Sequence, residues 1–180
     1  MTTILINGAA EAFGRLYPKR LVDLGFPERY DPIVWFTALG ILAYGAGALA
    51  LRIVEARIDG VGVARRVYVA SCFTGVSGLL VLAVAPGYLV ASLGVLLVGG
   101  ISLTVTRAVG VIWVNRRTTS DVRATMQSML AQAEYGGEIL FGIALGAIAQ
   151  LTTISVAFTC SAAVIGFAGV MIVRSRSDGG

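Results

Sequence analysis

"VYVASCFTGVSGLLVLAVAPGYLVASLGVLLVGGISLTVT", residues 67 to 106, contains no charged side chain and is interrupted only by "APGY" at residues 85 to 88. A helix needs about 20 apolar residues to cross a hydrocarbon core about 30 Å thick. This stretch of roughly forty residues is therefore long enough for two membrane spans joined by a turn. The hydrophobic core of a soluble domain does not need that much uninterrupted apolar sequence. The stretch predicts a membrane protein.

The composition of the whole chain supports this prediction. Of its 180 residues, 57% are hydrophobic and 13% are charged, whereas soluble domains carry about a quarter charged residues. The net charge of +4 comes from basic residues that lie singly or in pairs between the apolar runs. Membrane topology accounts for that distribution better than binding to nucleic acid does. We therefore expect the lipid bilayer as a partner and no nucleic acid.

The remaining apolar runs extend the same pattern along the chain. They lack the period-two alternation of membrane barrel strands, so helices are expected throughout. The fold class is predicted as all-α, a polytopic membrane bundle of about six helices in a single domain over residues 1–180. The expected helices cover about 2–24, 32–57, 65–85, 88–115, 121–149 and 152–175. The first of them is either a span with a polar inner face or an interfacial amphipathic helix; its broad apolar surface favours the span.

Basic residues in the links predict the orientation. Three alternate segments carry arginines and are expected in the cytoplasm by the positive-inside rule: Arg52, Arg57, Arg65 and Arg66; Arg116, Arg117 and Arg123; Arg174 and Arg176. The links "APGY" and "QLTTI" carry none. The chain is therefore expected in a bacterial inner (plasma) membrane with both termini cytoplasmic. Lys19, Arg20 and Arg29 are exceptions, because they would lie outside.

Charged residues within the expected spans are the candidate functional residues, because a charge at membrane depth normally faces a cavity or a partner. They are Glu11, Arg15, Arg107, Glu134 and Glu138. Glu11 and Arg15 stand four residues apart and share a helix face. They form either a self-neutralising pair or part of a water-filled path.

Arg107 and Glu134 are expected on neighbouring helices. Arg107 lies about eight residues before Asn115, roughly 12 Å deep, and Glu134 about eleven residues after Arg123, roughly 16 Å deep. If the two helices form an antiparallel hairpin, an ion pair between Arg107 and Glu134 is geometrically allowed, and it is the structural alternative to a functional role. Glu138 lies one turn deeper with no basic residue at its level on that hairpin. Its carboxylate would be protonated, paired with another helix, or open to water.

Several function classes are excluded or disfavoured. The chain has no histidine, and Cys72 and Cys160 stand alone in apolar runs without metal-ligand spacing. No hydroxyl or thiol has a histidine to activate it, and no phosphate-binding glycine loop follows a strand. We expect no enzyme, no metal and no cofactor. The start at Met1 lacks the basic segment of a signal peptide, so no cleavable targeting segment is expected.

Glycine is the other marked feature, with 23 residues. Small residues recur at one-turn spacing in "GILAYGAGALA" (residues 40–50), "GVSG" (75–78), "GVLLVGG" (94–100) and "GIALG" (142–146). Such spacing lets helix backbones approach closely. It suits helices that slide against their neighbours, and a static bundle would use it too.

One stretch resembles a known family. "WVNRRTTSDVRATMQSMLAQAEYGGEIL", residues 113–140, resembles the segment from the tenth into the eleventh helix of major facilitator superfamily transporters, particularly drug-efflux-like bacterial members. The matching positions are Asn115, Arg116, Asp121, Arg123, Ala124, Thr125 and Ser128. "NGAAEAFGRLYPKRLVDLG" (residues 7–25) resembles the seventh helix, although Gly14 stands where that pattern has an acidic residue. "RIVEARIDGVGVARR" (residues 52–66) takes the place of the basic loop after the eighth helix, keeping Glu55, Arg57, Arg65 and Arg66.

The resemblance implies both a fold and a function. The family has twelve helices in two six-helix halves that hold substrate between them near the midplane, and this chain corresponds to the C-terminal half. It implies efflux of a small-molecule substrate by alternating access, with a separate N-terminal six-helix half as a candidate partner. The five charges would then line the substrate or proton pathway. Arg57, Arg65, Arg66, Asn115, Arg116, Asp121 and Arg123 would form the cytoplasmic loops. The alternative is a truncated, non-transporting membrane remnant or scaffold.

Overall fold

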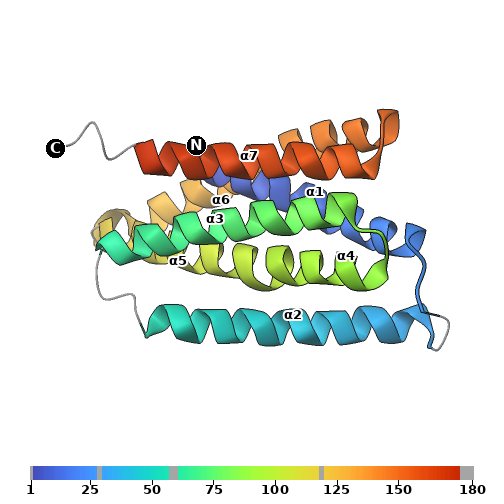
Figure 1. The fold of residues 1–180 in the computed structure, drawn as a ribbon. Coiled ribbons are helices and arrows are strands. Elements are labelled where there is room, and N and C mark those ends of the chain that lie inside the picture. The colour runs from blue at the N-terminus through green and yellow to red at the C-terminus, as the bar shows by residue number, and fades with distance from the viewer. Residues whose placement is uncertain (1, 28–29, 57–60, 118–119, 175–180) are drawn as a thin grey trace.

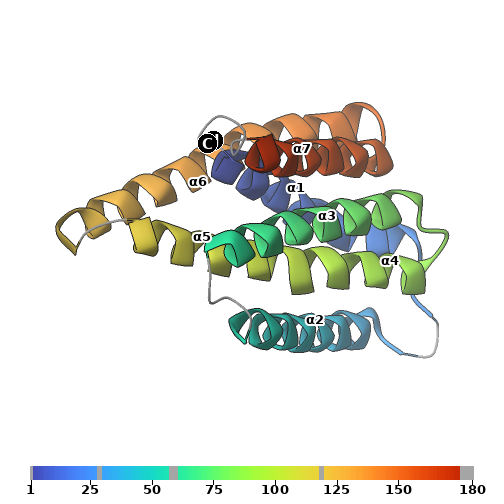
Figure 2. The same cartoon turned by 60° about the vertical axis from the view of Figure 1, so that its left-hand side comes forward.

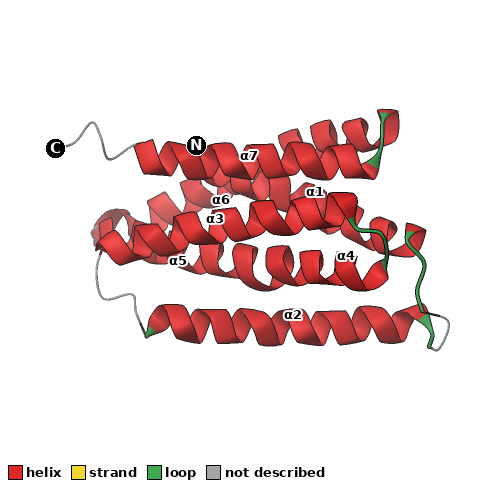
Figure 3. Ribbon diagram, in the orientation of Figure 1, coloured by secondary structure: helices red, strands yellow, loops and turns green. Residues whose placement is uncertain are grey.

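The computed structural model describes residues 2–27, 30–56, 61–117 and 120–174, and side chains within these ranges except those of residues 61 and 113–123. Every regular element in the described part is helical (Figure 3). The elements are α1 (Thr2–Asp23), α2 (Pro32–Glu55), α3 (Val61–Val84), α4 (Tyr88–Val95), η1 (Leu96–Ser102), α5 (Leu103–Arg117), α6 (Ser120–Leu151) and α7 (Ile154–Arg174). The all-α prediction is confirmed.

The third apolar run of the chain forms one continuous rod, built from α4, the π-helix η1 and α5. The described chain therefore has six helical rods, whose ends lie within four residues of the predicted ones. Local sequence sets several of these ends. Gly25, two residues after the end of α1, adopts φ +74°, a conformation that glycine takes without steric penalty. Asp31 caps α2 by accepting a hydrogen bond from the backbone N of Ile33 at 2.8 Å, and Pro32 follows in the first turn.

The helices run antiparallel in chain order, and their links alternate between the two ends of the bundle (Figure 1). The start of α1 and the end of α7 lie at the same end, in both Figure 1 and Figure 2. α3 is central and packs against α7 on one side and the α4–η1–α5 rod on the other, while α2 lies at the edge against η1 and α5. The most deeply buried large side chains, Phe158, Leu79, Leu82, Ile165 and Val98, fill the space between these elements.

Four of the described helices are long and apolar enough to cross a membrane: Pro32–Glu55, Gly62–Val84, Tyr88–Ile112 and Ile154–Arg174. The chain is thus a multi-pass membrane protein by length and composition. α1 and α6 fall outside this set, and they are the two helices that carry Glu11, Arg15, Glu134 and Glu138. They are also neighbours, because α6 packs chiefly along α1.

The packing of α6 corrects the hairpin geometry expected from the sequence. α6 lies along α1 and α7 and touches α5 at few points, although α5 and α6 are consecutive. Figure 2 shows α5 and α6 diverging away from the end of the bundle where α5 ends and α6 begins. Glycines explain the preference for α1. A Cβ added to Gly137 would overlap the carbonyl oxygen of Ile4, and one added to Gly8 would lie 2.5 Å from Cβ of Phe141. The two backbones can be this close because neither position carries a side chain.

Two arginines satisfy the carbonyl groups at helix C-termini, which have no partner within their own helix. Arg20 donates to the carbonyl oxygens of Leu82, Ala83 and Ala85 at 3.2–3.3 Å, where α3 ends. At the opposite end of the bundle, Arg65 donates to two carbonyl oxygens in the last turn of α7. Arg20 therefore has a structural reason to lie at the end where the positive-inside rule expects few basic residues.

Candidate functional site

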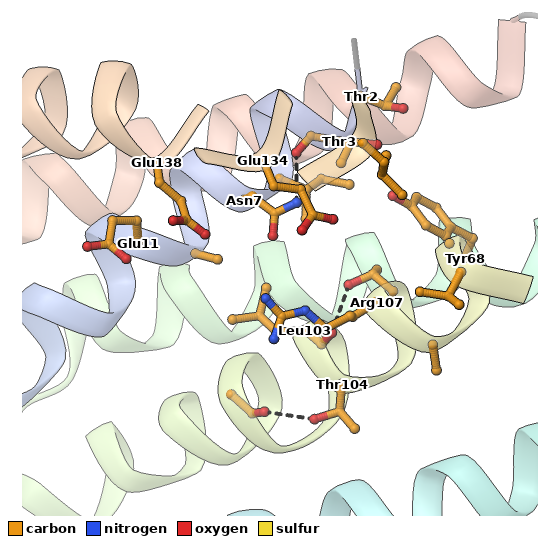
Figure 4. A pocket seen from close by; sticks show the side chains of 18 residues that line it. Thr2, Thr3, Asn7, Glu11, Tyr68, Leu103, Thr104, Arg107, Glu134 and Glu138 are labelled. Carbon is orange, nitrogen blue, oxygen red and sulfur yellow. Dashed lines mark hydrogen bonds between the residues drawn. The ribbon is translucent and has the colours of Figure 1, made fainter. Parts of the chain in front are cut away.

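A cavity of about 710 Å³ lies between α1, α6 and the η1–α5 segment, with Tyr68 of α3 also in its wall. Four of the five charged residues singled out from the sequence line it: Glu11, Arg107, Glu134 and Glu138. Figure 4 shows the side chains of Glu134, Glu138 and Arg107 directed into one space around Asn7. Pockets of this size are typical of small-molecule sites. Charged side chains from α1, α5 and α6 thus face the same interior space.

Arg15, the fifth of these residues, lies outside the cavity wall. Its side chain is 71% exposed, and its Nε contacts Oε1 of Glu11 at 2.5 Å. The i, i+4 pair expected from the sequence is therefore present. It partly neutralises Glu11 at the rim of the cavity.

Arg107 and Glu134 share the cavity without meeting. Within the described ranges, no salt bridge reaches Arg107, Glu134 or Glu138; those present are Glu11–Arg15 and Lys19–Asp23. The divergence of α5 and α6 is the cause, because an ion pair across the hairpin needs the two helices in contact. Glu134, like Glu138, therefore has no salt bridge within the described ranges, whereas the hairpin geometry had allowed one for Glu134 alone. Both carboxylates face cavity space.

The close packing of α1 on α6 positions the acidic residues. Glu138 and Gly142 stand four residues apart on α6 and so share a face. A Cβ added to Gly142 would lie 3.3 Å from Cγ of Glu11. The absent side chain at Gly142 lets Glu11 reach across from α1, so that carboxylates from two helices line one cavity.

The π-helix η1 positions the opposite wall. Ser102 ties it to α3 by donating to the carbonyl oxygen of Ser71 at 2.7 Å. Thr104 Oγ1 donates to the carbonyl oxygen of Gly99, five residues earlier, at 3.2 Å, which is the spacing of π-helical backbone bonds. Arg107 follows about one turn later and enters the cavity. π-helical turns occur often at functional sites.

Uncharged polar residues that were not expected from the sequence form another part of the cavity wall. They are Thr2, Thr3, Asn7, Tyr68, Thr104 and Thr106. A signal existed for part of this set, because Asn7 precedes Glu11 by four residues and so shares its face of α1. The threonines of α5 read as ordinary residues of an apolar span. Nothing in their spacing separates a lining residue from a packing one.

Only some of the side chains expected in the cytoplasmic loops lie in the described part of the chain. Arg57 lies outside the described residues. The side chains of Asn115, Arg116, Asp121 and Arg123 also lie outside the described part, although their backbone is helical. Arg65 caps α7 as stated above, which gives it a structural role, and Arg66 is exposed.

A second cavity of about 500 Å³ lies between α1, α2 and the α4–η1–α5 rod. It is mainly apolar and includes the aromatic residues Phe13, Tyr17, Phe36 and Tyr44. Gly99 and Thr104 belong to the walls of both cavities. This space is not predictable from the sequence, since its lining residues have the pattern of lipid-facing or packing positions.

In the part of the chain that the structure describes, no three His, Cys, Asp or Glu residues are grouped so that they could hold a metal ion. Cys72 is buried and Cys160 half-buried, and each is a free thiol. Comparison of the chain with models of protein families, with curated proteins and with solved structures finds no match.

Proposed function

We propose that this chain transports small molecules across a cell membrane by alternating access, as the C-terminal six-helix half of an efflux carrier of the major facilitator type. The observation that carries the proposal is the shared cavity of Glu11, Arg107, Glu134 and Glu138. Charges within membrane helices mark substrate and proton pathways when they face a cavity. A bundle that only packs has no need to place unpaired carboxylates around an interior space of about 710 Å³.

In this proposal α1 and α6 also span the bilayer, each shielded on its polar side by the other and by the cavity. The orientation follows from charge. Arg52, Arg65, Arg66 and Arg174 belong to helix ends at the same end of the bundle as the two termini (Figure 1), which favours a cytoplasmic location for that end. A separate N-terminal six-helix half would supply the opposing wall of the substrate path.

Export by cells or proteoliposomes that contain this chain with an N-terminal half tests the proposal. Glu138→Gln is expected to lower export about tenfold or more and to weaken its coupling to protons. The transported compound or proton then loses its interaction with a charged carboxylate. Glu55→Gln is the matched control, since Glu55 is an exposed carboxylate at the end of α2. Export that is unaffected by Glu138→Gln contradicts the mechanism. Complete absence of movement with the unmodified chain favours the scaffold or remnant instead.

A further inference from the structure

We propose that a second copy of this chain covers the rim of the charged cavity, so that the chain acts as a dimer joined along α1 by Glu11 and Arg15 of both copies. This inference rests on the proposed function and names its partner, because a second copy takes the place of a separate N-terminal half. The observation that carries it is an exposed ion pair on the part of α1 that lies within the bilayer when α1 is a span.

The Glu11–Arg15 pair lies well inside α1. Arg15 precedes the end of the helix at Asp23 by eight residues, about 12 Å along the axis. Its Nε contacts Oε1 of Glu11, one turn farther from that end, so the guanidinium points away from the nearer membrane surface. The side chain of Arg15 is nevertheless 71% exposed. Because charged groups at this depth face protein or water rather than lipid, another surface must cover this part of α1.

The surface around the pair leaves room for another helix. Gly14, next to Arg15, is exposed, and a Cβ added to it meets no atom within 4 Å. A glycine on an exposed helix face lets the backbone of a second helix approach closely. Glu11 also belongs to the wall of the charged cavity. A helix that packs on Gly14 therefore covers the rim of that cavity.

The charges on this surface are complementary to themselves, which favours a second copy as the occupant. Identical chains usually pair about a two-fold axis, which brings the same surface of both chains together. With the axis normal to the membrane and beside Gly14, the residues of the two copies lie at equal depths. Arg15 of each copy then faces Glu11 of the other, and the four charges alternate in sign around the axis. A carboxylate has two oxygens and a guanidinium five N–H donors, so each group can bond within its own chain and across the axis.

A second ion pair on the same helix provides a matched control. Lys19 and Asp23 are also four residues apart and exposed, and they form a salt bridge at 3.2 Å. Asp23 is the last residue of α1, so this pair lies at the end of the helix, where water and lipid head groups can solvate it. It needs no partner chain.

Energy transfer between donor-labelled and acceptor-labelled chains in liposomes, followed as lipid is added, measures the dimerisation constant. Glu11→Arg makes the surface basic and Arg15→Glu makes it acidic. Each variant alone is expected to dimerise about tenfold or more weakly than the unmodified chain, because like charges meet across the axis. A mixture of the two variants should regain dimerisation, since opposite charges then meet. Asp23→Lys and Lys19→Asp, tested in the same way, should dimerise as the unmodified chain does.

Disulfide cross-linking tests the same surface with a smaller substitution. In a chain that carries Cys72→Ala and Cys160→Ala, Gly14→Cys should form a cross-linked dimer when copper phenanthroline is added as oxidant. A disulfide requires the two Cα atoms to lie within about 7 Å of each other. Gly45→Cys on α2 is the control, because a Cβ there also meets no atom within 4 Å, and it should not cross-link.

Three results would overturn the proposed dimer. They are dimerisation that each charge variant retains, variants whose mixture stays monomeric, and a Gly14→Cys chain that does not cross-link. Failure of this inference and failure of the proposed function are distinguishable. An unmodified chain that stays monomeric, yet exports together with a separate N-terminal half, overturns the dimer and leaves the proposed function standing. A dimer that forms as expected but moves no compound upholds the interface and contradicts the proposed function.

Discussion

The α1–α6 pair and α2 are opposite kinds of membrane helix. α2 is strongly apolar, yet it lies at the edge of the bundle and exposes large side chains such as Ile41, Leu42 and Tyr44. α1 and α6 carry charges and are not apolar enough to stand among the four evident spans, yet they make the closest helix contact in the described chain. Hydropathy therefore identifies the surface that a helix offers to lipid, whereas glycine and charge together identify the interior of the bundle.

The difference has a physical cause. Between helices in a bilayer, apolar side chains gain little over contact with lipid, so close backbone approach decides which helices associate. α1 and α6 achieve it at Gly8 and Gly137. α2 achieves it beside the π-helix, where a Cβ added to Gly47 would lie 2.8 Å from the carbonyl oxygen of Gly100. Breaking the contact between α1 and α6 should therefore destabilise the protein more than breaking the contact between α2 and the π-helix.

The largest effect is expected from Gly137→Leu. Its Cβ would overlap the Ile4 backbone, which cannot move aside as a flexible side chain can, so α1 must separate from α6. We expect a loss of about 3 kcal/mol or more in the free energy of unfolding, measured as a fall in the melting temperature of the purified protein in detergent. Gly146→Leu on the same helix is the control, because a Cβ there meets no atom within 4 Å. Equal melting temperatures for the two variants would show that α1 does not depend on this contact.

A smaller effect is expected from Gly47→Leu, since α2 packs at the edge of the bundle. The Leu side chain would displace α2 from the π-helix at a cost of about 2 kcal/mol, while the packing of α1 on α6 should persist. Limited proteolysis is expected to cut the displaced α2 before the other helices. Gly45→Leu, which points into open space two residues away, should leave both melting and cleavage unchanged. Cleavage of α1 before α2 would contradict the expectation that α2 is the more weakly held helix.

The sequence was sufficient to predict the class of fold and four charged residues that line the cavity. The two predictions succeed for different reasons. Helix positions follow from apolar length, which depends on local composition alone. Glu11, Arg107, Glu134 and Glu138 were identifiable because a charge in an apolar run stands out residue by residue. Their mutual arrangement was not, because it depends on which helices pair. The assumption that consecutive helices α5 and α6 lie together led to an Arg107–Glu134 ion pair that the described structure lacks.

The second cavity was beyond prediction for a related reason. Gly40, Gly45 and Gly47 belong to one small-residue run, yet Gly47 contacts the π-helix, Gly40 lines a cavity and Gly45 faces outward. Their spacing in the sequence does not indicate which of the three glycines takes which of these positions. The π-helical turn places Gly99 and Thr104 in both cavity walls. It is tied to α3 by the hydrogen bond from Ser102, a tertiary contact that residue spacing does not indicate.

The most direct test of the account compares two adjacent residues of α6. Glu138 lines the polar cavity, while Ile139 is 63% exposed on the outer surface of the bundle. If the bundle lies in a membrane and the cavity holds water, a thiol ionises and reacts at position 138 but not at position 139, because the thiolate is the reactive form. Cys72→Ala and Cys160→Ala remove the two native thiols.

In open membrane fragments that carry this cysteine-free chain, Glu138→Cys should react with a membrane-impermeant maleimide about tenfold faster than Ile139→Cys. Exposure on the bare bundle would give the reverse order, since Ile139 is the more accessible side chain there. A rate at Ile139→Cys equal to or above that at Glu138→Cys would contradict the claim that the charges of this chain face a water-filled cavity within the bilayer.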